Sequence, residues 1–354
     1  MGIPPVLCIT GRSGSGKTHL LAELIRRLTG RGLRVGAIKH CHRVDAGVSG
    51  KDSDLLAAAG ACPAVAASDD VVLVAAAGGQ THLADLAATF CAGRDLVLAE
   101  GYRQSVHDKV LVVGRGDPPP AEAVRLLAGS GDVEAVEEWV LSWLDRRRAA
   151  RRVLTAAVLT GGASRRMGTD KTLLRVAGER VLSRLGALLA DRFGQTMYVG
   201  SEPDWTDLPA CLRGAWHPDL TPGRGPMGGV AAALRIAAAG RRPRGVCVVA
   251  CDMPALGGEL LDHLLAGRDP GAAATVLVNP ATGRLEPLAA VYEPRALPEM
   301  DQAISDGRLS LTAWLCEADA CRLPLPAELA GQCAGANTPE ELAAIERSRS
   351  RRGL

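Results

Sequence analysis

The sequence predicts an α/β protein made of two successive units, each with a mostly parallel sheet. Short apolar runs typical of buried strands alternate along the chain with stretches of helical periodicity. A glycine-rich loop follows directly on an apolar run twice, at residues 11–18 and 159–171. The chain has 354 residues, which is more than one hydrophobic core usually serves, so we expect two domains.

Composition narrows the class of protein. An apolar fraction of 47% excludes general disorder, and a net charge of +2 gives no reason to expect nucleic-acid binding. No apolar run approaches the roughly 18 residues of a membrane span, and the first residues lack the charged region of a signal peptide. The ten cysteines include no Cys-x-x-Cys pair, and most lie in apolar runs. These features favour a reduced, cytoplasmic protein that binds neither nucleic acid nor membrane.

The first unit opens with a complete phosphate-binding motif. An apolar strand at residues 5–10 leads into G-x-x-x-x-G-K-[ST], and a helix with leucines on one face follows. The backbone amides of such a loop cradle phosphates, its lysine reaches the terminal ones and its hydroxyl holds Mg²⁺. This context disfavours a flexible glycine linker. The predicted nucleotide-binding residues are Gly11, Ser13, Gly14, Ser15, Gly16, Lys17 and Thr18, with Thr18 also at the Mg²⁺.

Two later strands of this unit end in polar residues. Residues 33–38 lead into Lys39, His40 and His42; the two histidines face the same way in an extended segment and could hold a metal or a phosphate. Considered alone, they fit a solvated loop with incidental histidines better. Residues 95–101 form an apolar strand that ends at Glu100, where a parallel sheet places its ligands. We expect Glu100 to order Mg²⁺ or its waters, with a structural salt bridge as the alternative.

The remaining elements of the first unit complete an alternating pattern. We expect strands at residues 71–75 and 110–113, and helices at residues 54–61, 83–91 and 132–144. The basic run at residues 145–152 is most simply a solvated helix end and linker. The domains are therefore predicted at residues 1–148 and 153–354, with a basic linker at residues 149–152.

The second unit restarts with a strand at residues 153–159 and a second glycine-rich loop. Its paired glycines let the backbone approach a ligand closely, and cations follow within a few residues. A strand, a glycine turn and fixed positive charge suit a polyphosphate. The paired glycines are Gly161 and Gly162, and the cations that follow them include Arg166 and Lys171.

Two carboxylates complete the second site. Asp252 ends the apolar run that starts at residue 245, and a charge there is costly to bury without a partner. Mg²⁺ bridging a nucleotide phosphate would supply that partner. Asp219 precedes a glycine loop and is a candidate for Mg²⁺ or for the sugar or base. A helix N-cap is the alternative for each. Further strands are expected at residues 196–199, 272–278 and 287–292, and a helix spans the leucines of residues 182–189.

Residues 159–171 resemble the signature of molybdenum cofactor guanylyltransferases. Supporting pieces follow in the family's order: Asp219 ahead of Gly-Pro-Met-Gly-Gly at 225–229, Cys-Asp-Met-Pro at 251–254, Glu286 with Pro287, and Asn-Thr-Pro-Glu-Glu-Leu at 337–342. The resemblance implies a Rossmann-like nucleotidyltransferase domain. It further implies transfer of GMP from GTP to the terminal phosphate of molybdopterin or Mo-molybdopterin, with release of pyrophosphate.

The resemblance also implies roles for single residues. Leu159, Thr160 and Gly161 would contact the nucleotide, as would Asp219. Lys171 would contact the GTP phosphates, and Asp252 both GTP and Mg²⁺. Chemistry alone assigns Arg166 to the departing pyrophosphate, because a fixed cation stabilises developing negative charge.

The sequence departs from this family pattern at two positions. Thr160 stands where alanine is common, and its hydroxyl could donate to a phosphate. The asparagine that often follows the second strand is absent, and Ser201 is the nearest substitute.

The first unit resembles the molybdopterin-guanine dinucleotide biosynthesis adapter protein. The matching pieces are the phosphate loop, Lys39 with His40, residues 50–53, 59–61 and 95–101, and Lys109. The resemblance implies a P-loop NTPase-like domain that binds GTP, hydrolyses it weakly and assists the transferase. It also implies a site at His40 and His42 and leaves open a dimer through this domain. Molybdoenzymes or their chaperones are the further partners that it suggests.

Two other classes of function stay open at this point. One is another nucleotidyltransferase, acting on CTP in the same cofactor pathway or on a sugar phosphate; the paired Gly161 and Gly162 favour the guanylyl branch. The other is a non-enzymatic P-loop module for cofactor delivery, whose second half only binds.

Overall fold

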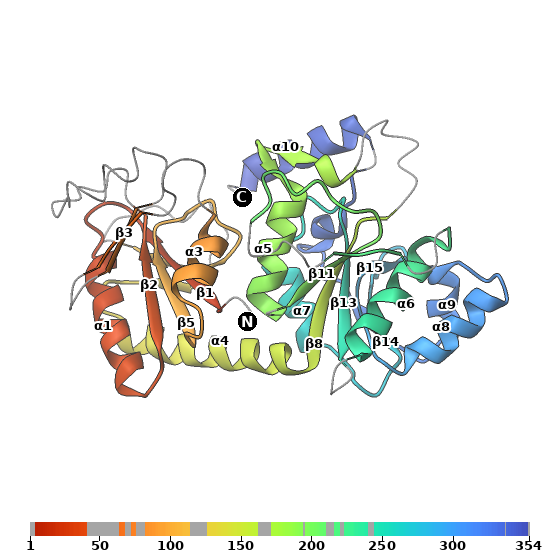
Figure 1. The fold of residues 1–354 in the computed structure, drawn as a ribbon, viewed down its shortest axis with the longest axis horizontal. Coiled ribbons are helices and arrows are strands. Elements are labelled where there is room, and N and C mark those ends of the chain that lie inside the picture. The colour runs from red at the N-terminus through yellow and green to blue at the C-terminus, as the bar shows by residue number, and fades with distance from the viewer. Residues whose placement is uncertain are drawn as a thin grey trace.

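The computed structural model describes residues 4–40, 64–67, 72–75, 82–113, 126–161, 171–193, 195–209, 216–219, 223–239, 244–336 and 338–352. Figure 1 shows an amino-terminal part, here residues 4–128, and a carboxyl-terminal part, here residues 154–352. One long helix, α4 (Val133–Val153), runs along both parts. The predicted α/β class with mostly parallel sheets is confirmed.

The amino-terminal part is organised around a parallel sheet. Within the described residues this sheet has five strands in the order β2-β5-β1-β6-β7, and every pair is parallel. The strands are β1 (Val6–Gly11), β2 (Val35–Lys39), β5 (Leu96–Glu100), β6 (Asp108–Val112) and β7 (Leu126–Ala128). Helices α1 (Lys17–Gly30) and α3 (Leu83–Phe90) connect strands. Since helices cover a parallel sheet on both faces, its central strands are mostly apolar, and their polar residues lie near the strand ends.

The carboxyl-terminal part has a larger, mixed sheet. Over the described ranges it has seven strands in the order β12-β11-β8-β13-β15-β14-β16, and only β15 runs antiparallel to its neighbours. The strands are β8 (Leu154–Leu159), β11 (Thr196–Val199), β12 (Trp216–His217), β13 (Gly245–Ala250), β14 (Ala274–Val278), β15 (Leu285–Tyr292) and β16 (Ala320–Pro324). A small antiparallel pair, β9 (Arg175–Val176) and β10 (Glu179–Arg180), stands apart.

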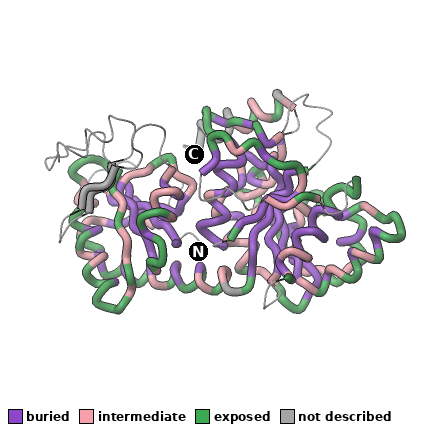
Figure 2. Tube along the Cα trace, in the orientation of Figure 1, coloured by how far each residue is buried: buried purple, intermediate pink, exposed green. Residues whose placement is uncertain are grey.

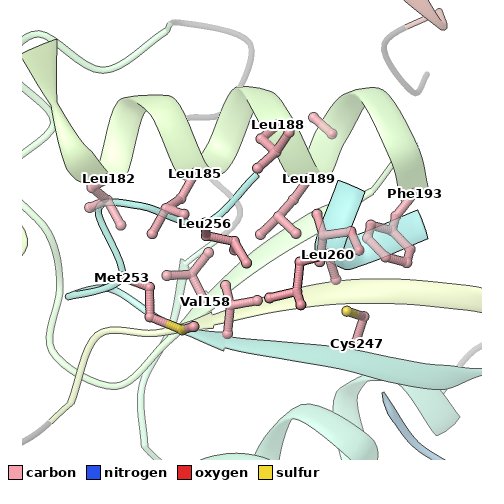
Figure 3. Packing of buried hydrophobic residues seen from close by; sticks show 14 of the residues in the cluster. Val158, Leu182, Leu185, Leu188, Leu189, Phe193, Cys247, Met253, Leu256 and Leu260 are labelled. Carbon is pink, nitrogen blue, oxygen red and sulfur yellow. The ribbon is translucent and has the colours of Figure 1, made fainter. Parts of the chain in front are cut away.

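Helices cover both faces of this larger sheet. They are α5 (Val181–Phe193), α6 (Gly225–Ala238), α7 (Gly258–Ala266), α8 (Ala296–Ser305), α9 (Leu311–Glu317) and α10 (Pro339–Arg352), with the short 3₁₀ turns η1 (Lys171–Leu173) and η3 (Ala330–Cys333). Figure 3 shows the leucines of α5 packed toward Val158 of β8 and Leu260 of α7. The helix expected over residues 182–189 is confirmed and extends a turn further at its end.

Apolar side chains account for the interior of both parts. The inner strands of both sheets are buried over most of their length, whereas the edge strands β2, β12 and β16 are only partly buried (Figure 2). Cys8, Cys91 and Cys247 are free and buried, as predicted, and burial raises the pKa of the Cys8 and Cys247 thiols to about 12. These cysteines therefore act as small hydrophobic side chains.

One expectation about the amino-terminal part needs correction. The basic run at residues 145–152 is not a solvated linker, because α4 is helical as far as Val153 and Arg147 is buried. The strand expected at residues 71–75 is confirmed as β4 (Val72–Ala75), which pairs antiparallel with β3 (Ala64–Ala67) in a separate two-stranded sheet. The helix expected at residues 54–61 lies outside the described residues. The domain boundaries stay a prediction.

Within the described ranges, no helix is both long enough and apolar enough to span a membrane.

Candidate functional site

The first glycine-rich loop continues β1 at the carboxyl edge of its sheet, the edge at which parallel strands end. Gly11, Gly14 and Gly16 have φ values of 147°, 77° and 86°, which other residues rarely adopt. An added Cβ on Gly11 would lie 2.5 Å from the Val112 carbonyl oxygen, so the loop is also crowded. Within the part of the chain that the structure describes, the buried Oγ of Ser15 has no hydrogen-bond partner. The glycine conformations leave room for a phosphate group beside the loop backbone, and the Ser15 hydroxyl could donate a hydrogen bond to one of its oxygens.

Thr18 and Glu100 meet at this loop. The Thr18 hydroxyl donates to Glu100 Oε2 at 2.9 Å, and Lys39 Nζ lies 3.3 Å from Glu100 Oε1. Glu100 is only 8% exposed, because β5 lies between β1 and β2. A hydroxyl and a carboxylate in contact provide two oxygen ligands of the kind that Mg²⁺ prefers. The salt bridge proposed as the alternative role of Glu100 is present too, with Lys39 as its cation.

The predicted histidine pair is only partly described. The backbone N–H of His40 donates to the Glu100 carbonyl at 3.0 Å, and its ring lies edge-on to Tyr102, with centroids 5.1 Å apart. Tyr102 has a φ of 55°, an uncommon conformation for a tyrosine. His40 thus borders the phosphate loop next to Glu100. His42 lies outside the described residues, so a shared site stays a prediction.

The second glycine-rich loop leaves β8 at the carboxyl edge of the larger sheet. The Thr160 hydroxyl donates to the Ser201 carbonyl at 2.6 Å, and its N–H donates to the Val199 carbonyl at 2.9 Å. Gly200 has a φ of 126°, and a Cβ there would lie 2.4 Å from the Gly161 nitrogen. The exposed backbone of Gly161 therefore depends on glycine at position 200. Since the Thr160 hydroxyl is used by the protein, it serves this loop–loop contact.

Lys171 and Asp252 form the charged centre of this edge. Lys171 Nζ lies 2.6 Å from Asp252 Oδ2, although the two residues come from η1 and from the turn after β13. Asp252 is 14% exposed and Lys171 24%, so both remain within reach of a ligand. The Ala336 N–H donates to the Asp252 carbonyl at 2.8 Å, which fixes the backbone of the aspartate from the other side.

The N-cap alternative is wrong for both aspartates. The N-cap of α6 is Arg224 and that of α7 is Gly257, so neither Asp219 nor Asp252 caps the helix that follows it. Asp219 follows β12, on the same edge of the sheet as Asp252 but on the far side of β8. Gly162 and Arg166 lie outside the described residues, and their predicted roles stay predictions.

A third carboxylate lies at the same end of the larger sheet. Glu286, near the start of β15, is half-buried, and this burial raises its pKa despite Arg284 at 3.5 Å. Cys333 of η3 lies close enough for Glu286 to affect it, and burial with this negative charge raises the pKa of its thiol to about 12. Since β15 runs antiparallel to β13, its start lies beside the end of β13. The family-like Glu286 therefore borders the edge that carries Asp252.

The described residues at each edge could hold a metal ion only together with oxygens from a ligand or from water. Among the described residues, no group of three or more His, Cys, Asp or Glu side chains could hold a metal ion. Thr18 with Glu100, and Asp252 alone, offer only one or two oxygens each. Mg²⁺ keeps several waters and takes phosphate oxygens readily, so these residues fit an ion that arrives with a nucleotide.

Sequence reasoning missed one residue that shapes the first loop. A Cβ on Gly16 would lie 2.5 Å from Ser130 Cβ, so the loop before α4 packs directly on the phosphate loop. No local pattern marks Ser130, because it approaches Gly16 only through the folding of β7 beside β6.

Comparisons with known proteins match the two parts of the chain to two families. Residues 6–127 match the family described as molybdopterin guanine dinucleotide synthesis protein B, and residues 156–319 match the MobA-like NTP transferase domain. The chain is 35% identical over 199 residues, 54% of its length, to a probable molybdenum cofactor guanylyltransferase from Nostoc sp., of which it covers 90%. It is 36% identical to a probable molybdenum cofactor guanylyltransferase from Deinococcus radiodurans over 45% of its own length and 79% of the relative's.

The amino-terminal part has a different relative. A molybdopterin-guanine dinucleotide biosynthesis adapter protein from Haemophilus influenzae is 32% identical over 166 residues, covering 42% of the chain and 93% of the relative. Two relatives that each match nearly end to end, in different parts of the chain, identify two joined families. The chain therefore belongs to the MobB family through its amino-terminal part and to the MobA-like NTP transferase family, a family of nucleotidyltransferases, through its carboxyl-terminal part.

Proposed function

We propose that the carboxyl-terminal part transfers GMP from GTP to the terminal phosphate of molybdopterin or Mo-molybdopterin. A phosphate oxygen of molybdopterin attacks the α-phosphorus of GTP, a new P–O bond forms, and the bond from the α-phosphorus to the bridging oxygen breaks. The products are the guanine dinucleotide cofactor and pyrophosphate. The observation that carries this proposal is the Lys171–Asp252 pair beside a glycine-rich loop.

This transfer requires positioning and charge neutralisation and no covalent enzyme nucleophile. Lys171 lies where it can leave Asp252 for the GTP phosphates and offset the charge that grows on pyrophosphate. The backbone of Thr160 and Gly161 borders the nucleotide, and Asp219 is proposed to contact it. Leu159 and Gly162 complete the nucleotide-binding loop, and Arg166 is proposed to stabilise the leaving group.

Asp252 is the residue that would hold Mg²⁺ in this part. A magnesium ion bound with GTP neutralises phosphate charge and polarises the α-phosphoryl group. Once Lys171 releases it, the Asp252 carboxylate could bind this ion. The Ala336 N–H holds the backbone of Asp252 in place, and the Asp252 side chain is partly exposed.

The amino-terminal part is proposed to bind GTP with Mg²⁺ and to assist the transferase. Gly11, Gly14 and Gly16 open the loop for phosphates, Lys17 supplies its cation, and Thr18 with Glu100 would hold the metal. Its proposed dimerisation, a ligand at His40 and His42, and contact with molybdoenzymes or their chaperones belong to the same proposal. We also propose that the protein acts in the cytoplasm.

The direct test supplies the full-length protein and Mg²⁺ with molybdopterin and each of the four common NTPs. Products are identified by mass. The expected product is the guanine dinucleotide, formed only with GTP. A cytosine dinucleotide from CTP would assign the chain to the cytidylyl alternative. In a parallel reaction with a sugar phosphate in place of molybdopterin, nucleotide transfer to that phosphate alone would assign the chain to the other transferase class. Binding without any product would support a cofactor-delivery module.

A further inference from the structure

Charged side chains are buried between the two parts of the chain. They come from the start of β6, the last turns of α4, the end of α5 and the middle of α7. The group, called here the interface cluster, consists of His107, Asp108, Arg147, Asp191, Arg192 and Asp262. All except Asp262 are buried, and Arg192 is 0% exposed.

Asp108 of the amino-terminal sheet binds side chains of α4 and α5. Arg192 Nη2 donates to its Oδ1 at 2.9 Å, and Arg147 Nη2 pairs with its Oδ2. Trp143 of α4 donates its indole N–H to Asp108 Oδ2 at 2.7 Å. One carboxylate of the amino-terminal part therefore binds α4 and α5 at once.

Asp191 makes the reciprocal contact from the carboxyl-terminal part. Its Oδ1 accepts the backbone N–H of Val6, the first residue of β1, at 2.8 Å. His107 Nδ1 lies 3.4 Å from the same oxygen, and Arg147 Nη2 lies 3.6 Å from Oδ2. The Asp191 side chain of α5 thus accepts the Val6 N–H, which would otherwise donate its hydrogen bond to water.

Asp262 closes the cluster at its rim. Its side chain is 37% exposed, and its Oδ1 lies 3.2 Å from Arg192 Nε and 3.5 Å from Arg147 Nη1. Arg192 also fills the space above Gly258 of α7, where an added Cβ would lie 1.8 Å from its Nη2.

Apolar packing continues across the same boundary. A single cluster of buried hydrophobic side chains contains Val6, Cys8 and Ala87 of the amino-terminal part together with Leu154 and Leu188 of the carboxyl-terminal part. In Figure 1, α5 is the element of the carboxyl-terminal part that lies next to the beginning of the chain, in agreement with the Val6–Asp191 hydrogen bond. The charges are therefore desolvated within a packed contact.

The cluster lies at the amino edges of the strands. Val6 and Asp108 are the first residues of β1 and β6, whereas the phosphate loop follows the last residue of β1. The transfer loop likewise follows the end of β8, while α4 enters that strand at its start. Among the described residues, the contact between the parts thus lies at the edge of each sheet opposite to its nucleotide-binding loop.

Such a contact should fix one arrangement of the two parts. Shifting one part by a residue would leave buried charges without their opposite charges, which is far costlier than losing surface pairs. Separating the parts would expose the apolar side chains that they share. We propose that Asp191, Arg192 and Asp262 form a docking surface for the amino edge of the amino-terminal sheet. This surface holds both parts as one rigid unit, in which each nucleotide site can fill without separating them.

Amide hydrogen exchange in the full-length protein tests the docking. The readout is exchange at Val6 and residues 107–109, with Asp191→Asn as the variant; asparagine keeps the shape and an acceptor for Val6 but removes the charge. Exchange there should become on the order of 100-fold faster. The matched control, Asp207→Asn, removes a carboxylate from the exposed pair with Arg175 and should leave this exchange unchanged. Unchanged exchange in a folded Asp191→Asn protein overturns the proposal.

Gly258→Ala provides a second variant in case Asp191→Asn does not fold. Replacing a helical glycine by alanine normally stabilises a helix, but here the methyl group displaces Arg192 from the cluster. Exchange at Val6 should therefore increase. In the control Gly30→Ala, where a Cβ meets no atom within 4 Å, it should not. Slower or unchanged exchange in Gly258→Ala contradicts the docking role of Arg192.

Nucleotide addition tests the rigidity. Saturating Mg²⁺ and GTP should leave exchange at Val6 within about twofold of its rate in the free protein, because no described residue of either loop belongs to the interface cluster. A large increase on GTP addition would show that the parts separate when nucleotide binds, which would overturn the single rigid unit.

Discussion

The two glycine-rich loops lie at equivalent places, each at the end of the first strand of its part, but they are prepared for a nucleotide differently. In the first loop the carboxylate of Glu100 is 8% exposed and already held by Thr18 and Lys39. In the second, Lys171 and Asp252 hold each other and remain partly exposed. The carboxylate of the first site is therefore already held in place. In the second site, a ligand has to break the ion pair between Lys171 and Asp252.

This difference shows how related-looking loops can serve different chemistry. A cradle that is complete without its ligand suits binding, because little has to rearrange. In the second loop, the lysine can release the aspartate and bind phosphate, and the aspartate can then bind the metal ion. Both charges then lie where charge develops during transfer. The predictions below test this contrast.

The largest effect is expected at the second loop. Asp252→Asn should lower guanylyl transfer on the order of 10³-fold, because the charge that faces Lys171 and the proposed carboxylate ligand of the metal are both removed. Initial rates of dinucleotide formation measure this loss. GTP binding at the first loop, followed in the same variant, should not change. The control is Asp301→Asn, which removes the carboxylate on α8 that pairs with Arg235 of α6. This variant should keep the wild-type rate.

Alanine substitutions of Gly200 and Gly161 should show whether the second loop needs glycine because a Cβ would clash with neighbouring atoms. Gly200→Ala should cost about 3 kcal/mol of unfolding free energy and most of the transfer activity, because its Cβ meets the Gly161 nitrogen at 2.4 Å and its φ is 126°. Gly161→Ala should cost much less stability, since its Cβ lies 3.6 Å from the Gly200 Cα. Urea unfolding measures both; equal destabilisation by the two substitutions would contradict this account of the loop.

A smaller effect is expected at the first loop. Thr18→Ala removes a hydrogen bond to a buried carboxylate, worth about 1.5–3 kcal/mol, and should weaken Mg²⁺-dependent GTP binding by about 10- to 100-fold. Thr18→Ser keeps the hydroxyl and should bind nearly as the wild type does. Titration calorimetry of the full-length protein, in an Asp252→Asn background to silence transfer, gives the comparison. Equal binding by the alanine and serine variants would exclude the hydroxyl as a ligand.

The smallest effect on activity is expected from the interface cluster, which lies away from both loops. Burial would raise the pKa of Asp191, but Arg147, His107 and Arg192 outweigh it and lower the pKa to about 2. A lowered carboxyl pKa contributes stability that is fully present above the ordinary value near 4 and is lost as the pH falls toward 2.

The difference in unfolding free energy between the wild type and Asp191→Asn should therefore be constant between pH 8 and 6. It should shrink by about 2 kcal/mol as the pH falls from 5 toward 2. Urea unfolding at several pH values measures it. A difference that stays constant into acid would mean that the carboxylate charge does not stabilise the fold.

The sequence was most informative where parallel strands end. The carboxyl ends of parallel strands meet at one edge, so Glu100 could be assigned to the phosphate loop, and Asp252 to the second loop, before any contact was known. The pairing of Lys171 with Asp252 could not be predicted, because it depends on how η1 folds back over the edge.

The interface cluster was hidden from the sequence for a different reason. A basic run such as residues 145–152 usually faces water, and nothing local shows that Arg147 is buried. Its partners, Asp108 and Asp262, lie in distant segments and in different parts of the chain. Only the docking of the two parts brings these charges together.

The division of labour between the loops is tested most directly by transfer from GTP radiolabelled at its α-phosphate, with Lys17→Ala and Asp252→Asn compared in the full-length protein. The account predicts labelled dinucleotide from Lys17→Ala at a measurable rate and almost none from Asp252→Asn. Normal labelling with Asp252→Asn, or complete loss with Lys17→Ala, would contradict the assignment of transfer to the Lys171–Asp252 site.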